Sequence, residues 1–150
     1  MEMNSMGENG INDKYIIIVG CGKLGAHLAG LLFESGKSVV MVDMRPSAFG
    51  RLPDGFGGFM LEADATELDT LKKAGIENAD VFVATTDDDN TNIMLTQIAK
   101  TIYGVKKVVA RVYEPHRQKV YEEFELETIC PMILSAEAFR DYIESDGGGE

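Results

Sequence analysis

A glycine-rich turn at residues 20–25 constrains the fold more than any other feature of the chain. Its sequence, Gly20-Cys21-Gly22-Lys23-Leu24-Gly25, follows the apolar run Tyr15–Val19 and opens a segment with leucines at helical spacing. A G-x-G-x-x-G turn between a buried strand and a helix is typical of dinucleotide-binding units. The first glycine permits the tight turn, the second lets a phosphate approach the backbone, and the third lets the helix pack on the strand. Free N–H groups at the helix N-terminus attract the phosphates.

An acidic residue stands where such a unit binds ribose. Asp43 ends the next apolar run, Ser38–Asp43, and lies 23 residues after Gly20. An acid there accepts hydrogen bonds from ribose hydroxyls and repels a 2′-phosphate, which favours NAD over NADP. Arg45 either softens that repulsion, lies over the adenine, or is a solvated loop arginine. Lys23 either contacts a terminal phosphate or is a solvated residue at the helix start.

Cys21, inside the turn, is interpreted as a small residue that fills space. The alternative is a redox role, because a thiol at a helix N-terminus has a lowered pKa.

Apolar runs and helical segments alternate along the whole chain. Strands are expected at 15–19, 38–43, 59–62, 81–85, within 105–112 and at 127–129, and helices at 23–34, 66–74, 87–103, 115–124 and 135–143. Because every strand is a continuous apolar run, the pattern predicts a parallel sheet covered on both faces. The fold class is therefore α/β: a doubly wound, mostly parallel, Rossmann-like sheet. Thr66 is expected to cap its helix, and the breaker-rich segment 44–58 leaves room for at most a short helix.

The chain of 150 residues is the size of one domain. We expect a flexible segment at 1–13, one lobe at 14–144 and a flexible tail at 145–150. The net charge of −11 argues against a nucleic acid partner and against an anionic membrane surface. No apolar run approaches the roughly 18–20 residues of a membrane span, and residues 1–14 have no signal-peptide core, so a cytoplasmic location is expected.

Residues for catalysis or metal binding do not cluster in the sequence. Cys21 and Cys130 lack zinc-ligand spacing, and the two histidines, His27 and His116, lie far apart. The run Asp87-Asp88-Asp89 is interpreted as helix-capping and solvated acids. The sequence therefore predicts no catalytic residue and no metal site.

Several motifs resemble the nucleotide-binding N-terminal lobe of RCK/KTN domains (TrkA-N type), found in Trk- and Ktr-type potassium-transport regulators. The resemblance covers about residues 14–144 and rests on VGCGKLG (19–25), VVMVD (39–43), EADAT (62–66), AGIENADVFVATTDDDNTN (74–92), ARV (110–112) and ICPMILSAEAF (129–139). Many Rossmann domains share the first two motifs. The Asp-Ala-Thr and A-G-I-x-x-A-D motifs are the discriminating ones.

The resemblance implies roles for residues beyond the glycine turn. Asp64 would reach the adenine end with Ala65 beside it, Thr85 and Thr86 would border the ribose and phosphates, and Arg111 would lie near the phosphates or the facing subunit. From the residues alone, Asp64 followed by Thr66 also fits a helix-capping device, and Arg111 also fits a surface ion pair. The full predicted cofactor-binding set is Gly20, Cys21, Gly22, Lys23, Leu24, Gly25, Asp43, Met44, Arg45, Asp64, Ala65, Thr85, Thr86 and Arg111.

The resemblance also implies a function: a regulatory (gating) subunit of a Trk/Ktr-type potassium transport system that senses ATP, ADP, AMP or NAD(H). Such lobes form homo- or hetero-oligomeric dimers that assemble into a ring under a channel, here at the cytoplasmic face of the inner membrane. The alternatives are an NAD-dependent oxidoreductase fragment and a standalone nucleotide or redox sensor. The apolar helix near the C-terminus would either cross to a neighbouring subunit or pack on its own sheet edge.

Three features depart from the family pattern. The usual second, C-terminal lobe is not in these 150 residues, which implies either a partner chain that supplies it or a truncated chain. Met132 follows Pro131 where some relatives carry a glutamate for a divalent ion. Segment 46–58 is richer in glycine than the helix usual there, which leaves the ribose rim undefined.

Overall fold

The computed structural model describes residues 14–146. The flexible segment expected at 1–13 and most of the tail expected at 145–150 lie outside the described residues. The strands are β1(Tyr15–Val19), β2(Ser38–Asp43), β3(Phe59–Glu62), β4(Val81–Ala84), β5(Lys107–Arg111) and β6(Glu127–Ile129). The α-helices are α2(Lys23–Glu34), α3(Leu68–Lys73), α4(Asp89–Thr101), α5(Pro115–Glu122) and α6(Pro131–Glu144), and two short 3₁₀ helices are η1(Pro46–Arg51) and η2(Ile76–Asn78).

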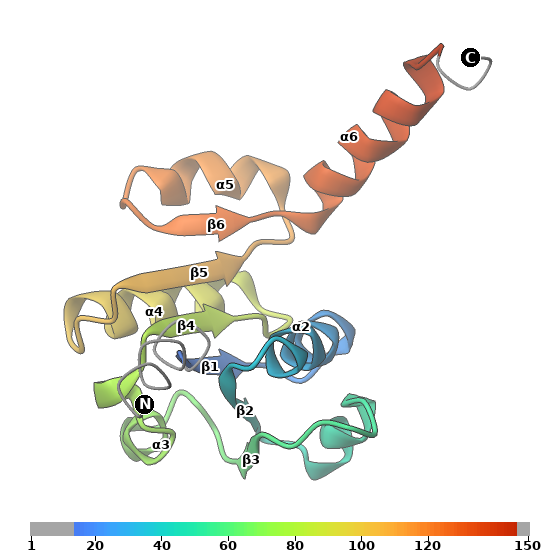
Figure 1. Cartoon of the computed structure of the whole chain (residues 1–150). Helices are drawn as coiled ribbons and strands as arrows, with labels where there is room; N and C mark the ends of the chain where they lie inside the picture. Colours follow the sequence, from blue (N-terminus) through green and yellow to red (C-terminus); the bar gives the residue numbers. More distant parts are fainter. Residues whose placement is uncertain (1–13, 147–150) are drawn as a thin grey trace, which may run out of the picture.

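The strands form a single parallel sheet in the order β3-β2-β1-β4-β5-β6 (Figure 1). This order confirms the predicted doubly wound, Rossmann-like class. The direction of winding reverses beside β1, which pairs with β2 on one side and β4 on the other. In such sheets the crevice outside the carboxyl ends of the strands at this reversal is the usual ligand site.

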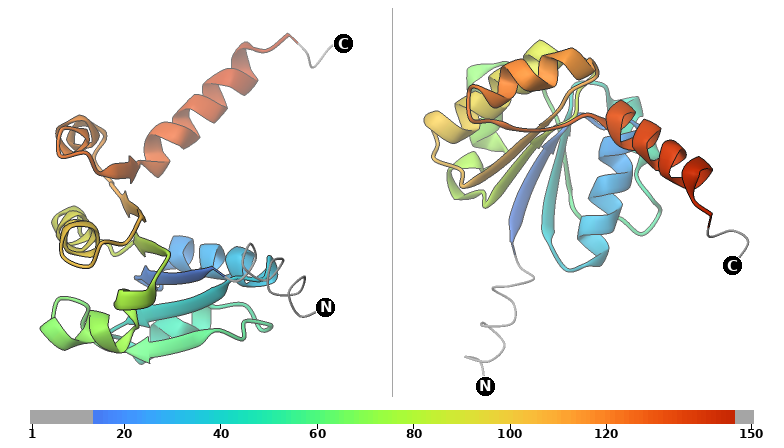
Figure 2. Two further views of the ribbon diagram at one scale, coloured as in Figure 1. Left: turned by 60° about the vertical axis from the view of Figure 1, so that its left-hand side comes forward. Right: turned by 90° about the horizontal axis from the view of Figure 1, so that it is seen from above.

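Helices lie on both faces of the sheet (Figure 2), and an apolar cluster is buried on each face. Ile17 and Val19 of β1 belong to the cluster with α3 and α4, whereas Ile16 and Ile18 belong to the cluster with α2 and η1. Because β1 is buried on both faces, its sequence is a continuous apolar run without polar alternation. The central strands therefore behave as the sequence predicts.

The edge strand β3 departs from the expectation that every strand is covered. Phe59 is 76% exposed and Met60 is 56% exposed. The segment between β2 and β3 forms only η1, which lies against α2 and β2. Without a full helix in this connection, the outer strand of the sheet keeps much of its apolar surface in solvent.

Three helix starts differ from those predicted, and α4 begins at Asp89 and not at residue 87. Helix α3 has Glu67 and not Thr66 as its N-cap, because the Thr66 hydroxyl donates to Asp64 (2.6 Å). Helix α6 begins at Pro131, four residues earlier than expected, with proline in the first turn where its missing N–H costs nothing.

Helix α6 extends away from the rest of the domain (Figure 1). None of its residues is buried, and Phe139, Tyr142 and Ile143 are more than 70% exposed. The alternative in which this helix packs on its own sheet edge is therefore wrong. Within residues 14–146, no helix combines the length and apolar character needed to cross a membrane.

Candidate functional site

A cleft of about 850 Å³ opens at the carboxyl ends of the strands beside the winding reversal. Its volume is within the range of small-molecule and cofactor sites. Every residue of the predicted cofactor-binding set lines this cleft except Cys21 and Gly25. The structure thus brings together side chains from four separate strand ends and from the turn after β1.

The three glycines of the turn have different structural roles. Gly20 has φ +106°, and a Cβ on Gly25 would lie 2.0 Å from the carbonyl oxygen of Gly20. A Cβ on Gly22 would meet no atom within 4 Å. Gly20 and Gly25 are therefore required by the fold, whereas Gly22 leaves open space on the cleft side of the turn.

The start of helix α2 faces the cleft with unsatisfied donors. Gly22 is its N-cap and supplies no side-chain cap, so the first N–H groups of the helix have no side-chain acceptor. Lys23 and Leu24, which follow, line the cleft. This arrangement favours the binding of an anion, because the free N–H groups and the positive end of the helix dipole both face the cleft.

Asp43 joins the glycine turn to the end of β2. Its Oδ2 accepts a hydrogen bond from the Cys21 N–H (2.8 Å), and its Oδ1 accepts one from the Arg45 N–H (2.9 Å). A carboxylate has about four lone-pair positions, so each oxygen retains acceptor capacity on the cleft side. Asp43 is thereby held in a fixed orientation beside the turn.

Cys21 faces the core and not the cleft. Its side chain is fully buried in the cluster under α2. Burial, with the negative charge of Asp43, raises the pKa of the Cys21 thiol to about 11. The alternative of a lowered pKa at the helix N-terminus is therefore wrong, because burial and the charge of Asp43 outweigh the opposing positive charge of Arg51. The space-filling interpretation of Cys21 fits the structure.

Asp64 and Ala65 lie at the β3 side of the cleft. The Asp64 Oδ1 accepts from the backbone N–H (2.9 Å) and the hydroxyl (2.6 Å) of Thr66, and these hydrogen bonds lower the pKa of the Asp64 carboxyl. Asp64 thus forms a turn with Thr66 and lines the cleft. It does not cap α3, whose N-cap is Glu67 without a side-chain hydrogen bond, so the helix-capping interpretation is wrong.

Thr85 and Thr86 follow β4 at the centre of the cleft. The Thr85 hydroxyl, which is buried, donates to the Gly20 carbonyl (3.0 Å) and so ties the glycine turn to β4. Thr86 is held by Asn92 of α4, whose Oδ1 accepts from the Thr86 N–H (2.9 Å). Both threonines are structural parts of the cleft wall.

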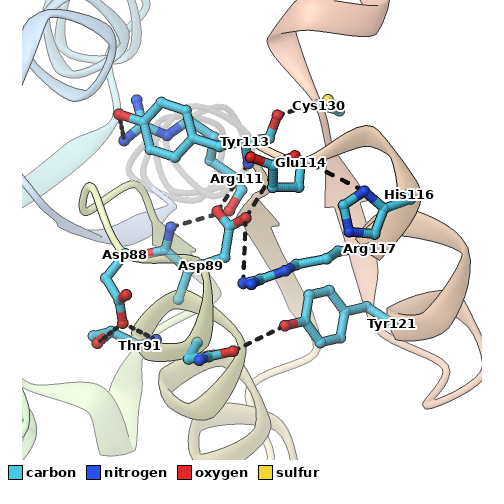
Figure 3. Close-up of polar contacts among 12 residues, drawn as sticks. Asp88, Asp89, Thr91, Arg111, Tyr113, Glu114, His116, Arg117, Tyr121 and Cys130 are labelled. Atoms are coloured by element: carbon cyan, nitrogen blue, oxygen red, sulfur yellow. Dashed lines mark hydrogen bonds and ion pairs between the residues drawn. The ribbon is translucent and has the colours of Figure 1, made fainter.

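Arg111 ends β5 and crosses toward β4 (Figure 3). Its guanidinium donates to the carbonyl of Thr86 and lies 4.2 Å from the ring centre of Tyr113. Among residues 14–146 it makes no ion pair, so the surface ion-pair interpretation is wrong.

Asp88 and Asp89 have different environments, although both were expected to be capping or solvated acids. Asp88 caps α4 by accepting from the Thr91 N–H and hydroxyl, which lower the pKa of its carboxyl. Asp89 is instead 5% exposed and accepts from the N–H groups of Tyr113 (2.8 Å) and Glu114 (3.3 Å). The solvated interpretation is wrong for Asp89, which anchors the connection after β5.

Three residues that shape the site are not among the site residues predicted from the sequence. The Arg51 guanidinium lies at the turn and donates to the Cys21 carbonyl (3.1 Å), and Tyr113 forms part of the cleft wall. Fully buried Asn92 links the ends of β4 and β5. Only Asn92 carries a usable signal, because it shares the helical period of the buried residues Leu95 and Ala99.

Comparison with known proteins identifies a family that this chain resembles. A family model described as the TrkA-N domain matches residues 16–131. The Trk system potassium uptake protein TrkA of Streptomyces coelicolor is 37% identical over 123 residues, which are 82% of this chain and 55% of that protein. The chain thus spans about half the length of the curated relatives it matches.

Solved structures share the fold. The GsuK channel bound to NAD matches with a TM-score of 0.76 at 26% identity, over 88% of this chain and 23% of that one. GsuK bound to ADP matches with a TM-score of 0.75 at 25% identity, over 89% of this chain and 34% of that one. Because the family model spans most of the described residues and the motifs of the turn and strand ends lie within it, this chain belongs to the TrkA-N domain family.

Proposed function

We propose that this chain binds an adenine nucleotide or NAD(H) in the cleft and acts as a regulatory (gating) subunit of a Trk/Ktr-type potassium transport system. One observation carries the binding proposal: the open side of Gly22 and the free N–H groups of α2 lie in the same cleft as the fixed carboxylate of Asp43. The names of the relatives support the transport role, and the NAD and ADP in the GsuK structures support the ligand class.

In this proposal each part of the cleft binds one part of the ligand. The phosphates lie at the start of α2, where Lys23 and Arg51 add positive charge. Asp43 accepts from the ribose hydroxyls. The adenine lies toward β3, among Met44, Arg45, Asp64 and Ala65.

A regulatory role is favoured over a catalytic one. A dehydrogenase needs groups that bind and polarise a second substrate over the reactive end of the cofactor. Neither His27, on α2, nor the exposed His116, on α5, lines the cleft. The binding of a ligand instead changes the population of two assembly states through its different affinity for them.

Asp43→Asn tests the ligand site. We expect affinity for ADP and NADH to fall about tenfold or more, because a charged acceptor for the ribose hydroxyls is lost. Calorimetric titration of both ligands measures this loss, and melting without ligand reports any damage to the turn. Asp54→Asn, an exposed acid outside the cleft, is the matched control.

These titrations, together with an assay of NADH oxidation by small carbonyl substrates, test the function. Nucleotide binding without hydride transfer to small carbonyl substrates supports the regulatory role, whereas turnover of NADH supports an oxidoreductase. If Asp43→Asn binds both ligands like the wild type, Asp43 is not part of the site.

We also propose that α6 mediates assembly into dimers, which then form a ring at the cytoplasmic face of a membrane channel. The exposed apolar residues of α6 support this proposal.

Phe139→Ser combined with Tyr142→Ser should convert the dimer to a monomer, as measured by size-exclusion chromatography with light scattering. Leu68→Ser on α3 changes an equally exposed apolar residue elsewhere and should leave the dimer intact. A wild-type chain that is monomeric at high concentration contradicts the proposal.

A further inference from the structure

The cleft has two halves, one on each side of the glycine turn. Asp43 and Asp64 lie on the β2–β3 side, and Thr86, Arg111 and Tyr113 lie on the β4–β5 side. A mononucleotide with its ribose at Asp43 and its phosphates at α2 fills the first half and the centre. The second half of the cleft then remains available for a group that is attached to the phosphates at the end away from the adenosine.

Tyr113 presents a fixed aromatic ring in this second half (Figure 3). Its side chain is 45% exposed, although the Arg111 guanidinium lies 4.2 Å from the ring centre and also donates to the hydroxyl (2.6 Å). Its backbone is held at both ends, because its N–H donates to Asp89 (2.8 Å) and its carbonyl accepts from the Cys130 thiol (3.7 Å). The ring is therefore ordered before any ligand arrives.

The charges of the second half indicate what group it accepts. Asp87 and Asp88 line it and are exposed, so they repel a further phosphate. The Arg111 guanidinium is already engaged by the Thr86 carbonyl and the Tyr113 ring. An uncharged ring avoids this repulsion, and a cationic ring avoids it too but lies near the positive charge of Arg111. Either ring gains a stacking surface, because bases stack on aromatic side chains.

We propose that Tyr113 is a specificity-determining residue that stacks on the second base of a dinucleotide, so that the cleft prefers NAD⁺ and NADH to ADP or ATP. This inference rests on the proposed function, because it assumes that the adenosine half binds at Asp43. It deepens that function by ranking the dinucleotides above the mononucleotides and assigns this preference to one side chain.

Calorimetric titration of NADH, NAD⁺ and ADP into the full chain tests the proposal with two variants. Tyr113→Leu retains an apolar side chain but removes the aromatic face and the hydroxyl that accepts from Arg111. We expect it to weaken binding of NADH and NAD⁺ about tenfold and to leave ADP affinity within about twofold, in line with the effect of one lost base stack. Tyr113→Phe keeps the ring and should retain most of the dinucleotide affinity.

The outcomes separate this inference from the proposed function. Equal losses for NADH and ADP, or no loss for NADH, overturn the role of Tyr113 while nucleotide binding stands. A wild-type chain that binds ADP more tightly than both dinucleotides has the same consequence. A wild-type chain that binds none of the three overturns both. If Tyr113→Phe loses as much dinucleotide affinity as Tyr113→Leu, that result also contradicts stacking. The melting temperature of each unliganded variant shows whether the ring beside Arg111 is also needed for folding.

Discussion

Replacing Gly25 with alanine will destabilise the domain by about 3 kcal/mol or more, whereas replacing Gly22 with alanine will cost at most about 1 kcal/mol. A Cβ on Gly25 would lie 2.0 Å from the carbonyl oxygen of Gly20 and 2.8 Å from the Thr85 hydroxyl. The backbone of the turn has little freedom to move away, because the Gly20 N–H is bonded to the Val42 carbonyl (2.8 Å). The helix must therefore shift off the strand.

Gly22→Ala is the matched variant in the same turn. Its Cβ would meet no atom within 4 Å, and φ is −81°, which alanine adopts readily. The same methyl group would stand on the cleft side of the turn, where a phosphate has to approach the helix N–H groups. We therefore expect Gly22→Ala to fold normally and to lose at least about tenfold in nucleotide affinity, as expected for blocked backbone contacts to a charged group.

Urea unfolding followed by circular dichroism separates these two effects. Gly25→Ala should move the unfolding midpoint far below that of the wild type, and Gly22→Ala should leave the midpoint nearly unchanged. A stable Gly25→Ala domain would mean that α2 and β1 can separate at little cost. If the Gly22→Ala domain retains full nucleotide affinity, the phosphates do not bind at the turn.

The unit from β1 to β2 could be predicted closely because its signals are local. The strand, the glycines and the helical period are contiguous in sequence, and the end of β2 falls where the acid is expected. The bounds of β1, α2 and β2 agree with those expected from the sequence. Local sequence signals could not predict the environment of Cys21, because the pKa of its thiol depends on burial under α2 and on Asp43, which is distant in sequence.

The β4–β5 half of the site was harder to predict because strand order creates it. Tyr113 and Asp89 are 24 positions apart in sequence, and they meet only because β4 and β5 are neighbours in the sheet. Arg51 reaches the turn from a glycine-rich segment with no periodic pattern to place it. The sequence identifies the chemical types of these residues, but the order of the strands in the sheet determines which groups they contact.

The early start of α6 has a different cause. The sequence pattern predicts a start at Ser135, but Pro131 is tolerated in a first helical turn and a cap side chain is not required there. The four extra residues carry Met132 and Leu134, both more than half exposed. They lengthen the apolar surface of a helix that leaves the domain, which strengthens the case for a partner along its length.

Asn92→Ala will be the other strongly destabilising substitution, at about 3 kcal/mol. The Asn92 side chain is fully buried, and its amide donates to the carbonyls of Thr86 (3.1 Å) and Arg111 (3.0 Å). Its oxygen accepts from the N–H (2.9 Å) and hydroxyl (2.6 Å) of Thr86. Alanine removes the Asn92 partner of the Arg111 carbonyl and of the Thr86 N–H, whereas the Thr86 carbonyl keeps its bond from the Arg111 guanidinium. Each buried group left unpaired costs roughly 1–3 kcal/mol.

Asn90→Ala, on the exposed side of the same helix, is the control for helix propensity. Asn90 makes one side-chain hydrogen bond, from the Tyr121 hydroxyl (3.1 Å), so its loss should change stability by less than about 1 kcal/mol. Urea unfolding of both variants measures the difference, and equal midpoints would mean that water replaces the Asn92 contacts. Because Thr86 and Arg111 line the cleft, Asn92→Ala should also weaken NADH binding under conditions where the variant is still folded, which makes Asn92 a positioning residue of the site as well as a member of its core.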